Sequence, residues 1–198
     1  MEYLITQYAL EAGALEIEYI EEFFGEFPRR KTAAEVLERL GGRESLILMA
    51  EAALPDDPAT RVPVAYKVVH ELRAVETEPK LRDLVERLRG CVTFDDRKVL
   101  YSWIGATRRD WRGQGHFRAL TEESETWAHA LGFHEVVVKT KNRFYDMRAV
   151  LAQLGFDVVK FERHAVGAAE SKVYLSKQLG ADLVRGHRSR RTVVQAGA

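Results

Sequence analysis

Cysteine is almost absent from this sequence, which holds a single one, Cys91, among 198 residues. A lone thiol cannot close a disulfide within the chain, and it fits a reducing compartment. No apolar run approaches the ~20 residues that a membrane-spanning helix requires. The first residues, Met1 to Glu22, are acidic and lack the basic start of a secretory signal. We therefore expect a cytoplasmic protein without a membrane segment.

Net charge is missing as well, because 30 basic side chains balance 30 acidic ones. No field of one sign favours a nucleic acid or a membrane surface as partner. No spacing of His, Cys, Asp or Glu is typical of a metal site, so we expect no metal. The length suits one domain, placed at 1–180 with a helical insertion at about 74–96. We interpret the basic stretch 181–198 as a solvated tail, with a phosphate- or partner-binding arm as the alternative.

Periodicity predicts strands alternating with helices, which indicates α/β or α+β layering. In the helix expected over 118–131, we place Leu131 on the inward stripe and Glu122 and Glu125 in water. The expected helices are 11–24, 32–40, 79–88, 118–131 and 147–154, and the expected strands are 45–50, 62–72, 99–107, 135–140, 156–161 and 171–175, with a turn at Pro55 to Pro58.

The most informative stretch is Trp111-Arg-Gly-Gln-Gly-His-Phe117. It follows the apolar run Val99 to Ala106 and precedes an amphipathic stretch, so the order is strand, glycine-rich turn, helix. Glycines let the backbone approach a ligand closely, and the free N–H groups of a helix's first turn favour an anion. The stretch therefore predicts a phosphate-binding site.

Three glycine-rich loops bind phosphates in this setting. A P-loop needs Gly-Lys-Ser/Thr, which occurs nowhere in the chain. A dinucleotide fingerprint needs a third glycine where Arg118 stands, and its acid must follow the next strand, whereas Glu135 precedes it. The third is the acetyltransferase loop, Arg/Gln-x-x-Gly-x-Gly/Ala, which cradles the pyrophosphate of coenzyme A.

On this loop the chain resembles the Gcn5-related N-acetyltransferase (GNAT) superfamily, from about Val62 to Leu179. Arg112 and Gly115 match the loop motif, and Phe117 stands where the family prefers Gly or Ala. Further on, three features are similar to the family's fifth strand, its cofactor-side asparagine and its helix ending in Gly-Phe: Val136 to Thr140, Asn142, and Met147 to Phe156.

The resemblance implies an α/β fold with a mixed, mostly antiparallel sheet flanked by helices, whose fourth and fifth strands splay apart for the coenzyme A arm. It implies an N-acyltransferase that moves an acetyl group from acetyl-CoA to a primary amine by direct attack. The pantetheine arm would pair with the strand backbone, the N–H groups of the loop would hold the pyrophosphate, and Arg112 would add charge. The implied cofactor-binding residues are Gly105, Ala106, Thr107, Arg112, Gly113, Gln114, Gly115, His116, Phe117 and Asn142.

Catalytic groups are harder to assign. Many family members protonate the departing thiolate with a tyrosine in a slot that Leu151 fills here, so Tyr145 is our candidate proton donor. The family's slot for a basic glutamate holds Tyr101, a poor base because its ordinary pKa is near ~10. Cys91 has no motif-level histidine partner, which favours a bystander over an acyl carrier. The remaining candidate groups, which water relays could replace, are Glu71, His70 and His116.

Two other functions stay open. A degenerate family member could bind acyl-CoA as a sensor or partner-binding module without turnover, as the missing tyrosine at Leu151 and the unusual Phe117 suggest. A protein that binds a nucleotide other than coenzyme A would prefer NAD or ATP. The sequence identifies neither the acceptor amine nor the oligomeric state, and a homodimer stays open.

Overall fold

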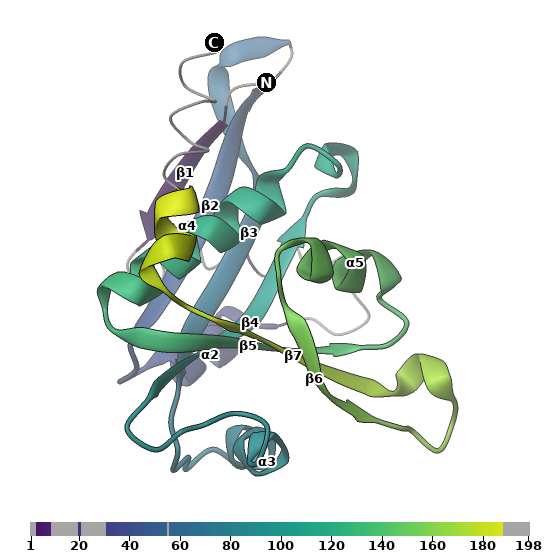
Figure 1. The fold of residues 1–198 in the computed structure, drawn as a ribbon. Helices are drawn as coiled ribbons and strands as arrows, with labels where there is room; N and C mark the ends of the chain where they lie inside the picture. The colour runs from purple at the N-terminus through teal and green to yellow at the C-terminus, as the bar shows by residue number, and fades with distance from the viewer. Residues whose placement is uncertain (1–2, 9–19, 21–30, 55, 188–198) are drawn as a thin grey trace. The chain divides into compact units, whose positions relative to one another are not determined.

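The computed structural model describes residues 3–8, 20, 31–54 and 56–187. Among these, seven strands form one sheet in the order β1-β2-β3-β4-β5-β7-β6. Strands β4 and β5 run parallel, whereas β1–β2, β2–β3, β5–β7 and β7–β6 are antiparallel. The elements in chain order (Figure 1) are β1 (Tyr3–Tyr8), α2 (Ala33–Leu40), β2 (Ser45–Leu54), β3 (Asp57–Leu72), α3 (Pro79–Leu88), β4 (Lys98–Thr107), the 3₁₀ turn η2 (Arg109–Trp111), α4 (His116–Ala130), β5 (Phe133–Lys141), α5 (Tyr145–Gln153), β6 (Asp157–Glu162), the 3₁₀ turn η3 (Ala168–Glu170) and β7 (Lys172–Gln178).

The chain divides into two compact units. The first comprises Met1–His70 and Trp103–Ser124, and the second comprises Glu71–Ser102 and Glu125–Ala198. Strand β4 and helix α4 each contribute residues to both units. Each unit has its own layering and is described by itself.

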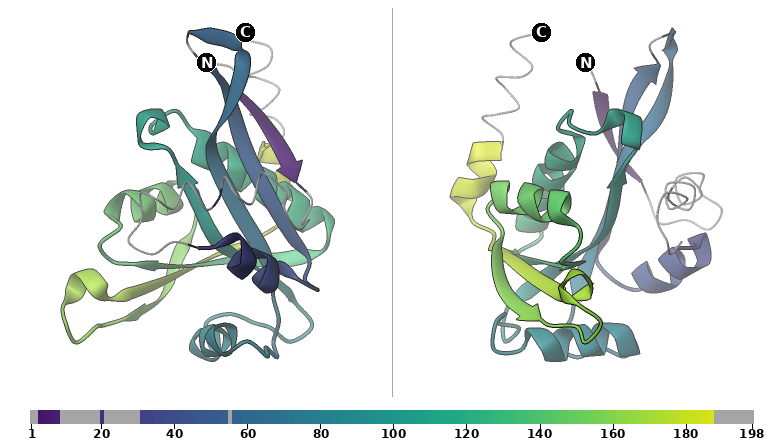
Figure 2. Two further views of the ribbon diagram at one scale, coloured as in Figure 1. Left: turned by 180° about the vertical axis from the view of Figure 1, so that it is seen from behind. Right: turned by 90° about the vertical axis from the view of Figure 1, so that its right-hand side faces the viewer.

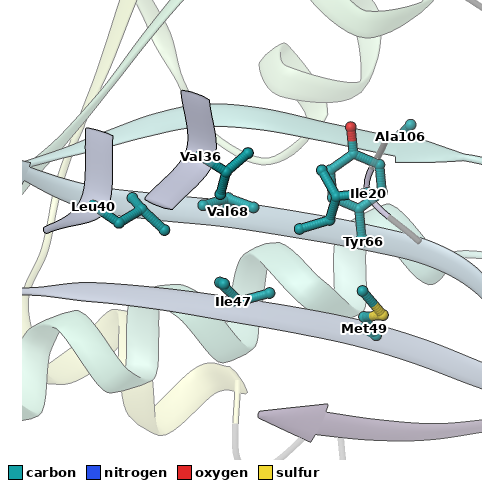
Figure 3. Packing of buried hydrophobic residues seen from close by; sticks show 8 residues of the cluster. All are labelled: Ile20, Val36, Leu40, Ile47, Met49, Tyr66, Val68 and Ala106. Atoms are coloured by element: carbon teal, nitrogen blue, oxygen red, sulfur yellow. The ribbon is translucent and has the colours of Figure 1, made fainter. Parts of the chain in front are cut away.

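In the first unit, α2 packs on the β2–β3 side of the sheet. Thr32 caps the helix, because its hydroxyl accepts from the Glu35 N–H while the Glu35 carboxylate accepts from the Thr32 N–H. Val36 and Leu40, one turn apart, then face the strands. Figure 3 shows the resulting core cluster, which consists of Ile20, Val36, Leu40, Ile47, Met49, Tyr66, Val68 and Ala106.

In the second unit, β5, β7 and β6 form an antiparallel set between two helices, α3 and α5 (Figure 2). Helix α3 begins with Pro79, whose fixed φ suits the first helical turn, and it ends at Leu88. Its buried side chains share one face: Leu81, Leu84, Val85 and Leu88. Helix α5 ends before Gly155, whose φ of +79° is the left-handed conformation of a helix end.

Most predicted elements are confirmed, often with shifted ends. The helix at 79–88 has the predicted bounds, and β3 begins earlier than the predicted residue 62. The sequence analysis missed β1, and the predicted helix at 11–24 lies outside the described residues. Residues 181–187, predicted as solvated tail, are helical, and Val184 and His187 are buried. The rest of that stretch, 188–198, is not described.

Helix α4 differs from the predicted inside–outside pattern. Glu122 and Glu125 are buried rather than solvated, and Leu131, expected inside, is 43% exposed just beyond the helix end. The burial of Glu125 is made possible by two partners in the second unit, Lys177 at 2.8 Å and His187 at 2.7 Å. A carboxylate that finds such partners can be buried, which a pattern of polar and apolar letters does not reveal.

Candidate functional site

The glycine loop connects the end of β4 to the start of α4, all within the first unit. The Arg108 N–H donates to the Val64 carbonyl at 2.9 Å, which ties the entry of the loop to β3. The Trp111 N–H donates to the Arg108 carbonyl at 2.9 Å, and the indole of Trp111 is only 7% exposed. The loop therefore enters its turn from an anchored position.

Gly113 and Gly115 give the turn its shape. Their φ values are +79° and +85°, in the left-handed region that side chains with a Cβ rarely adopt. A Cβ built at either position meets no atom within 4 Å, so each glycine is required by its backbone conformation rather than by crowding. Any side chain placed there would project into the open space in front of the loop.

The backbone donors of the loop are available to a ligand. In the described part of the chain, no N–H from Gly113 to Arg118 has an acceptor within hydrogen-bond distance, and the helical ladder begins with Ala119 N–H to Gly115 carbonyl at 3.0 Å. These are the unsatisfied donors of a helix N-terminus, where the helix dipole favours negative charge. The loop thus fits a phosphate or pyrophosphate group.

His116, predicted as part of this loop, has a buried ring, and its backbone N–H is one of the donors without an acceptor in the described part of the chain. The imidazole is 2% exposed and lies against Tyr3 and Trp111, with ring centroids 4.8 and 6.1 Å away. Neither ring nitrogen has a hydrogen-bond partner among the described residues. Burial lowers the pKa of His116, so the ring is neutral at pH 7 and packs beneath the loop.

The end of β4 presents three predicted cofactor contacts. A Cβ at Gly105 would lie 3.0 Å from the Tyr66 carbonyl, so a side chain there would require β3 to shift by a few tenths of an ångström. Ala106 is buried in the core cluster of the first unit. The carbonyl of Thr107 accepts from the Nε of Arg112 at 3.2 Å. The Phe117 ring, beside Gly105, has the Lys67 ammonium 4.6 Å from its centroid.

Asn142 and Tyr145 belong to the second unit. The Asn142 carboxamide donates to the Ala168 carbonyl at 3.1 Å and accepts from the Arg148 guanidinium, so it ties the turn before α5 to η3. Tyr145 is the first residue of α5 and is 63% exposed. It lines a cavity of about 310 Å³, together with Arg148, Ala149, Ala152, Phe156, Val158 and Leu175.

The other groups considered for catalysis lie in varied surroundings. Leu151 is fully buried in α5, and Tyr101 and His70 are also buried. Glu71 forms an ion pair with Arg73 at 2.8 Å, whereas Cys91 is exposed. In the described ranges, no three His, Cys, Asp or Glu residues are grouped as metal ligands would be, and every helix is too short or too polar to span a bilayer.

Two structural contributors were missed from the sequence. Trp111 anchors the loop, and its only signal is an aromatic residue directly before Arg-Gly-Gln-Gly. The buried group of Glu125, Lys177 and His187 joins α4, β7 and the helical residues 181–187. Lys177 and His187 lie 52 and 62 residues from Glu125 in sequence, so no local pattern could indicate the group.

Comparison with known proteins gives likeness in structure only. No family model and no curated protein matches the sequence. Arabidopsis thaliana NAA60 in complex with acetyl-CoA is 14% identical, with a TM-score of 0.66 over 90% of this chain and 99% of that one. The ribosomal-protein-S18-alanine N-acetyltransferase from Escherichia coli is 15% identical, with a TM-score of 0.59 over 89% and 95%. YncA from Salmonella typhimurium with its cofactor acetyl-CoA is 13% identical, with a TM-score of 0.59 over 90% and 95%.

Proposed function

We propose that this chain, which has the fold of the GNAT superfamily, is an acyl-CoA-dependent N-acyltransferase that moves an acetyl group from acetyl-CoA to a primary amine. The observation that carries the proposal is the loop before α4. Two left-handed glycines there precede a row of backbone N–H groups that have no acceptor in the described part of the chain. Such a row at a helix N-terminus suits a pyrophosphate.

The cofactor contacts follow from this assignment. The N–H groups of Gly113 to Phe117 hold the pyrophosphate, and the guanidinium of Arg112 adds positive charge beside them. The pantetheine arm pairs with the backbone of Gly105 to Thr107. Support comes from the register of β4 with β5, which runs from Lys98 to Tyr101 and so ends before this segment. We assign Asn142 an indirect part, since its carboxamide positions the turn before α5.

The chemistry needs little covalent help, because the thioester of acetyl-CoA is already activated. The amine nitrogen attacks the thioester carbonyl, a C–N bond forms, the C–S bond breaks, and coenzyme A leaves as a thiolate. One proton must leave the nitrogen, and one must reach the sulfur. We assign the second transfer to the hydroxyl of Tyr145, because Leu151 in the family's usual slot carries no proton.

Turnover with a panel of primary amines tests this function. Release of free coenzyme A that depends on the amine, with an acetylated product of matching mass, is the expected result. The buried Leu151 favours one alternative, a module that binds acyl-CoA without turning it over. Tight acetyl-CoA binding without release by any amine would support that module and contradict the enzyme.

A further inference from the structure

One face of the β5–β7–β6 set gathers lysines, and we call it the lysine face. Side chains alternate along a strand, so residues that pair across strands share a face. The register places Lys139 opposite Tyr174, which is opposite Lys160, and in the next row Lys141 opposite Lys172, which is opposite Glu162. The other face carries apolar partners, such as Val138 opposite Leu175. The lysines of this face therefore come from three adjacent strands, β5, β7 and β6, and not from one pair of neighbouring residues.

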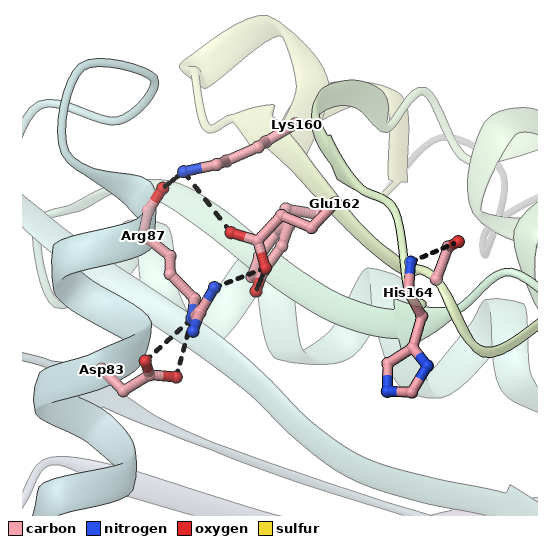
Figure 4. Close-up of polar contacts among 7 residues, drawn as sticks. Asp83, Arg87, Lys160, Glu162 and His164 are labelled. Atoms are coloured by element: carbon pink, nitrogen blue, oxygen red, sulfur yellow. Dashed lines mark hydrogen bonds and ion pairs between the residues drawn. The ribbon is translucent and has the colours of Figure 1, made fainter. Parts of the chain in front are cut away.

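Carboxylates bordering the lysine face are already engaged. Both oxygens of Asp83 accept from the Arg87 Nε at 2.8 Å, and Glu162 accepts from the Arg87 guanidinium at 2.6 Å (Figure 4). The Tyr174 hydroxyl also donates to Glu162, at 3.0 Å. Burial alone would raise the pKa of Glu162, but the hydrogen bonds from Arg87 and Tyr174, together with the positive charges of Arg87 and Lys160, outweigh it and lower the pKa. Glu162 is therefore charged and held in place.

Cations outnumber carboxylates on this face. Four lysines and Arg87 stand against three carboxylates, Asp83, Glu162 and Glu170, the last bound by Lys141 at 2.5 Å. The side chain of Lys172, unlike its backbone in the β7 ladder, forms no ion pair or hydrogen bond with any described residue. Asp157, opposite Ser176, lies one row beyond the end of the face. The face thus retains positive charge although the whole chain is neutral.

The spacing of the lysines indicates the kind of partner. Alternate residues on a strand lie ~6.8 Å apart, and neighbouring strands lie ~4.8 Å apart, so β5 and β6 are separated by ~10 Å. One carboxylate cannot reach cations spread over such distances, whereas an extended chain with several acidic side chains can. We propose that the lysine face binds an acidic segment of a polypeptide, which, if the proposed function holds, belongs to the amine acceptor.

Binding of a labelled peptide to the full chain tests the surface directly. The probe is a fluorescein-labelled peptide of alternating Glu and Ala with a free amino terminus, compared with a Gln/Ala peptide by anisotropy at about 50 mM salt. The variant Lys139→Gln/Lys172→Gln removes two charges and introduces no repulsion. Arg61→Gln is the matched control, because Arg61 is exposed and lies on β3 in the first unit.

We expect the acidic peptide to bind more tightly than the neutral one, and the double variant to raise its Kd about tenfold. Arg61→Gln should leave the Kd unchanged, and about 0.5 M salt should abolish the difference between wild type and the double variant. Equal binding of both peptides, or a double variant that binds the acidic peptide like wild type, would overturn the proposal. Calorimetry with acetyl-CoA on the same samples separates the two proposals. Acetyl-CoA binding without a preference for the acidic peptide would contradict only the proposed role of the lysine face. A preference for the acidic peptide without acetyl-CoA binding would contradict only the proposed enzyme function.

Discussion

The Nε of Arg112 donates to the carbonyl of Thr107 at 3.2 Å, so a side chain of the glycine turn reaches back to the last residue of β4. A second tie, from the Arg108 N–H to the Val64 carbonyl, holds the entry of the loop against β3. The backbone donors at the start of α4 are therefore ordered by the protein itself. A ligand that binds them avoids the entropic cost of ordering the loop.

Gly115→Val should abolish binding of acetyl-CoA and leave a folded protein. The valine side chain would project into the space in front of the loop, where the phosphate oxygens would lie. Gly132→Val is the matched control, because Gly132 has a φ of +78° and a Cβ there also meets no atom within 4 Å. Both variants should lose about 1–3 kcal/mol of stability from backbone strain. Calorimetry should show lost binding only for Gly115→Val, and equal affinities in both variants would remove the loop as the site.

His116→Phe should remove part of the acid sensitivity of folding. Burial lowers the pKa of His116, so the unfolded ring takes up a proton below its ordinary pKa of ~6.5 while the folded ring stays neutral. The wild-type free energy of unfolding should therefore fall as the pH drops below ~6.5, until the lowered folded pKa is reached. Phenylalanine fills a similar volume and does not titrate. Urea denaturation at about pH 5 and about pH 7.5 checks this, and an unchanged difference between the two pH values would contradict it.

Tyr145→Phe tests the proposed proton donor by removing only a hydroxyl. A general acid contributes on the order of 10²-fold or more, so kcat should fall by about that factor. The affinity for acetyl-CoA should barely change, because the ring and the cofactor loop remain. Steady-state kinetics with the best amine of the panel, together with calorimetry, supply both numbers. An unchanged kcat would show that Tyr145 is not the proton donor and is only an exposed residue that lines the cavity beside α5.

Cys91→Ala should retain full activity. Direct attack needs no acyl-enzyme, and the exposed Cys91 is the only thiol in the chain. Intact-mass spectra of the wild type after incubation with acetyl-CoA should show no added acetyl group. A stable adduct that disappears in the alanine variant, together with loss of turnover, would replace direct attack with a two-step mechanism.

Local patterns predicted the elements that matter most for the candidate site. The apolar run before Arg112 and the amphipathic stretch after Phe117 predict a strand and a helix because period two and period 3.6 are properties of the backbone. The glycines at 113 and 115 predict the turn for a similar reason, since their left-handed φ values are a local requirement. These inferences needed no knowledge of distant contacts.

Long-range partners are what the sequence analysis could not supply. Glu125 was predicted to face water, but it is buried against Lys177 and His187. The His116 ring was a candidate catalytic group, but it packs against the ring of Tyr3. Tyr3 belongs to β1, whose pairing with β2 joins residues 39 to 49 positions apart, from Tyr8 with Ile47 to Tyr3 with Ala52. The hydrogen bond from the Asn142 carboxamide to the Ala168 carbonyl in η3 is a further contact of this kind, between residues 26 positions apart.

Titration calorimetry of the wild type with acetyl-CoA, coenzyme A and S-acetylpantetheine tests the central claim most directly. S-acetylpantetheine keeps the thioester and the pantetheine arm but lacks the pyrophosphate that the N–H groups of Gly113 to Phe117 are proposed to hold. Acetyl-CoA and coenzyme A should bind, and S-acetylpantetheine should bind at least about 100-fold more weakly, since charge-assisted hydrogen bonds are the strong ones. Equal binding of all three, or no detectable binding of acetyl-CoA at about millimolar concentration, would contradict the assignment of this loop as a coenzyme A site.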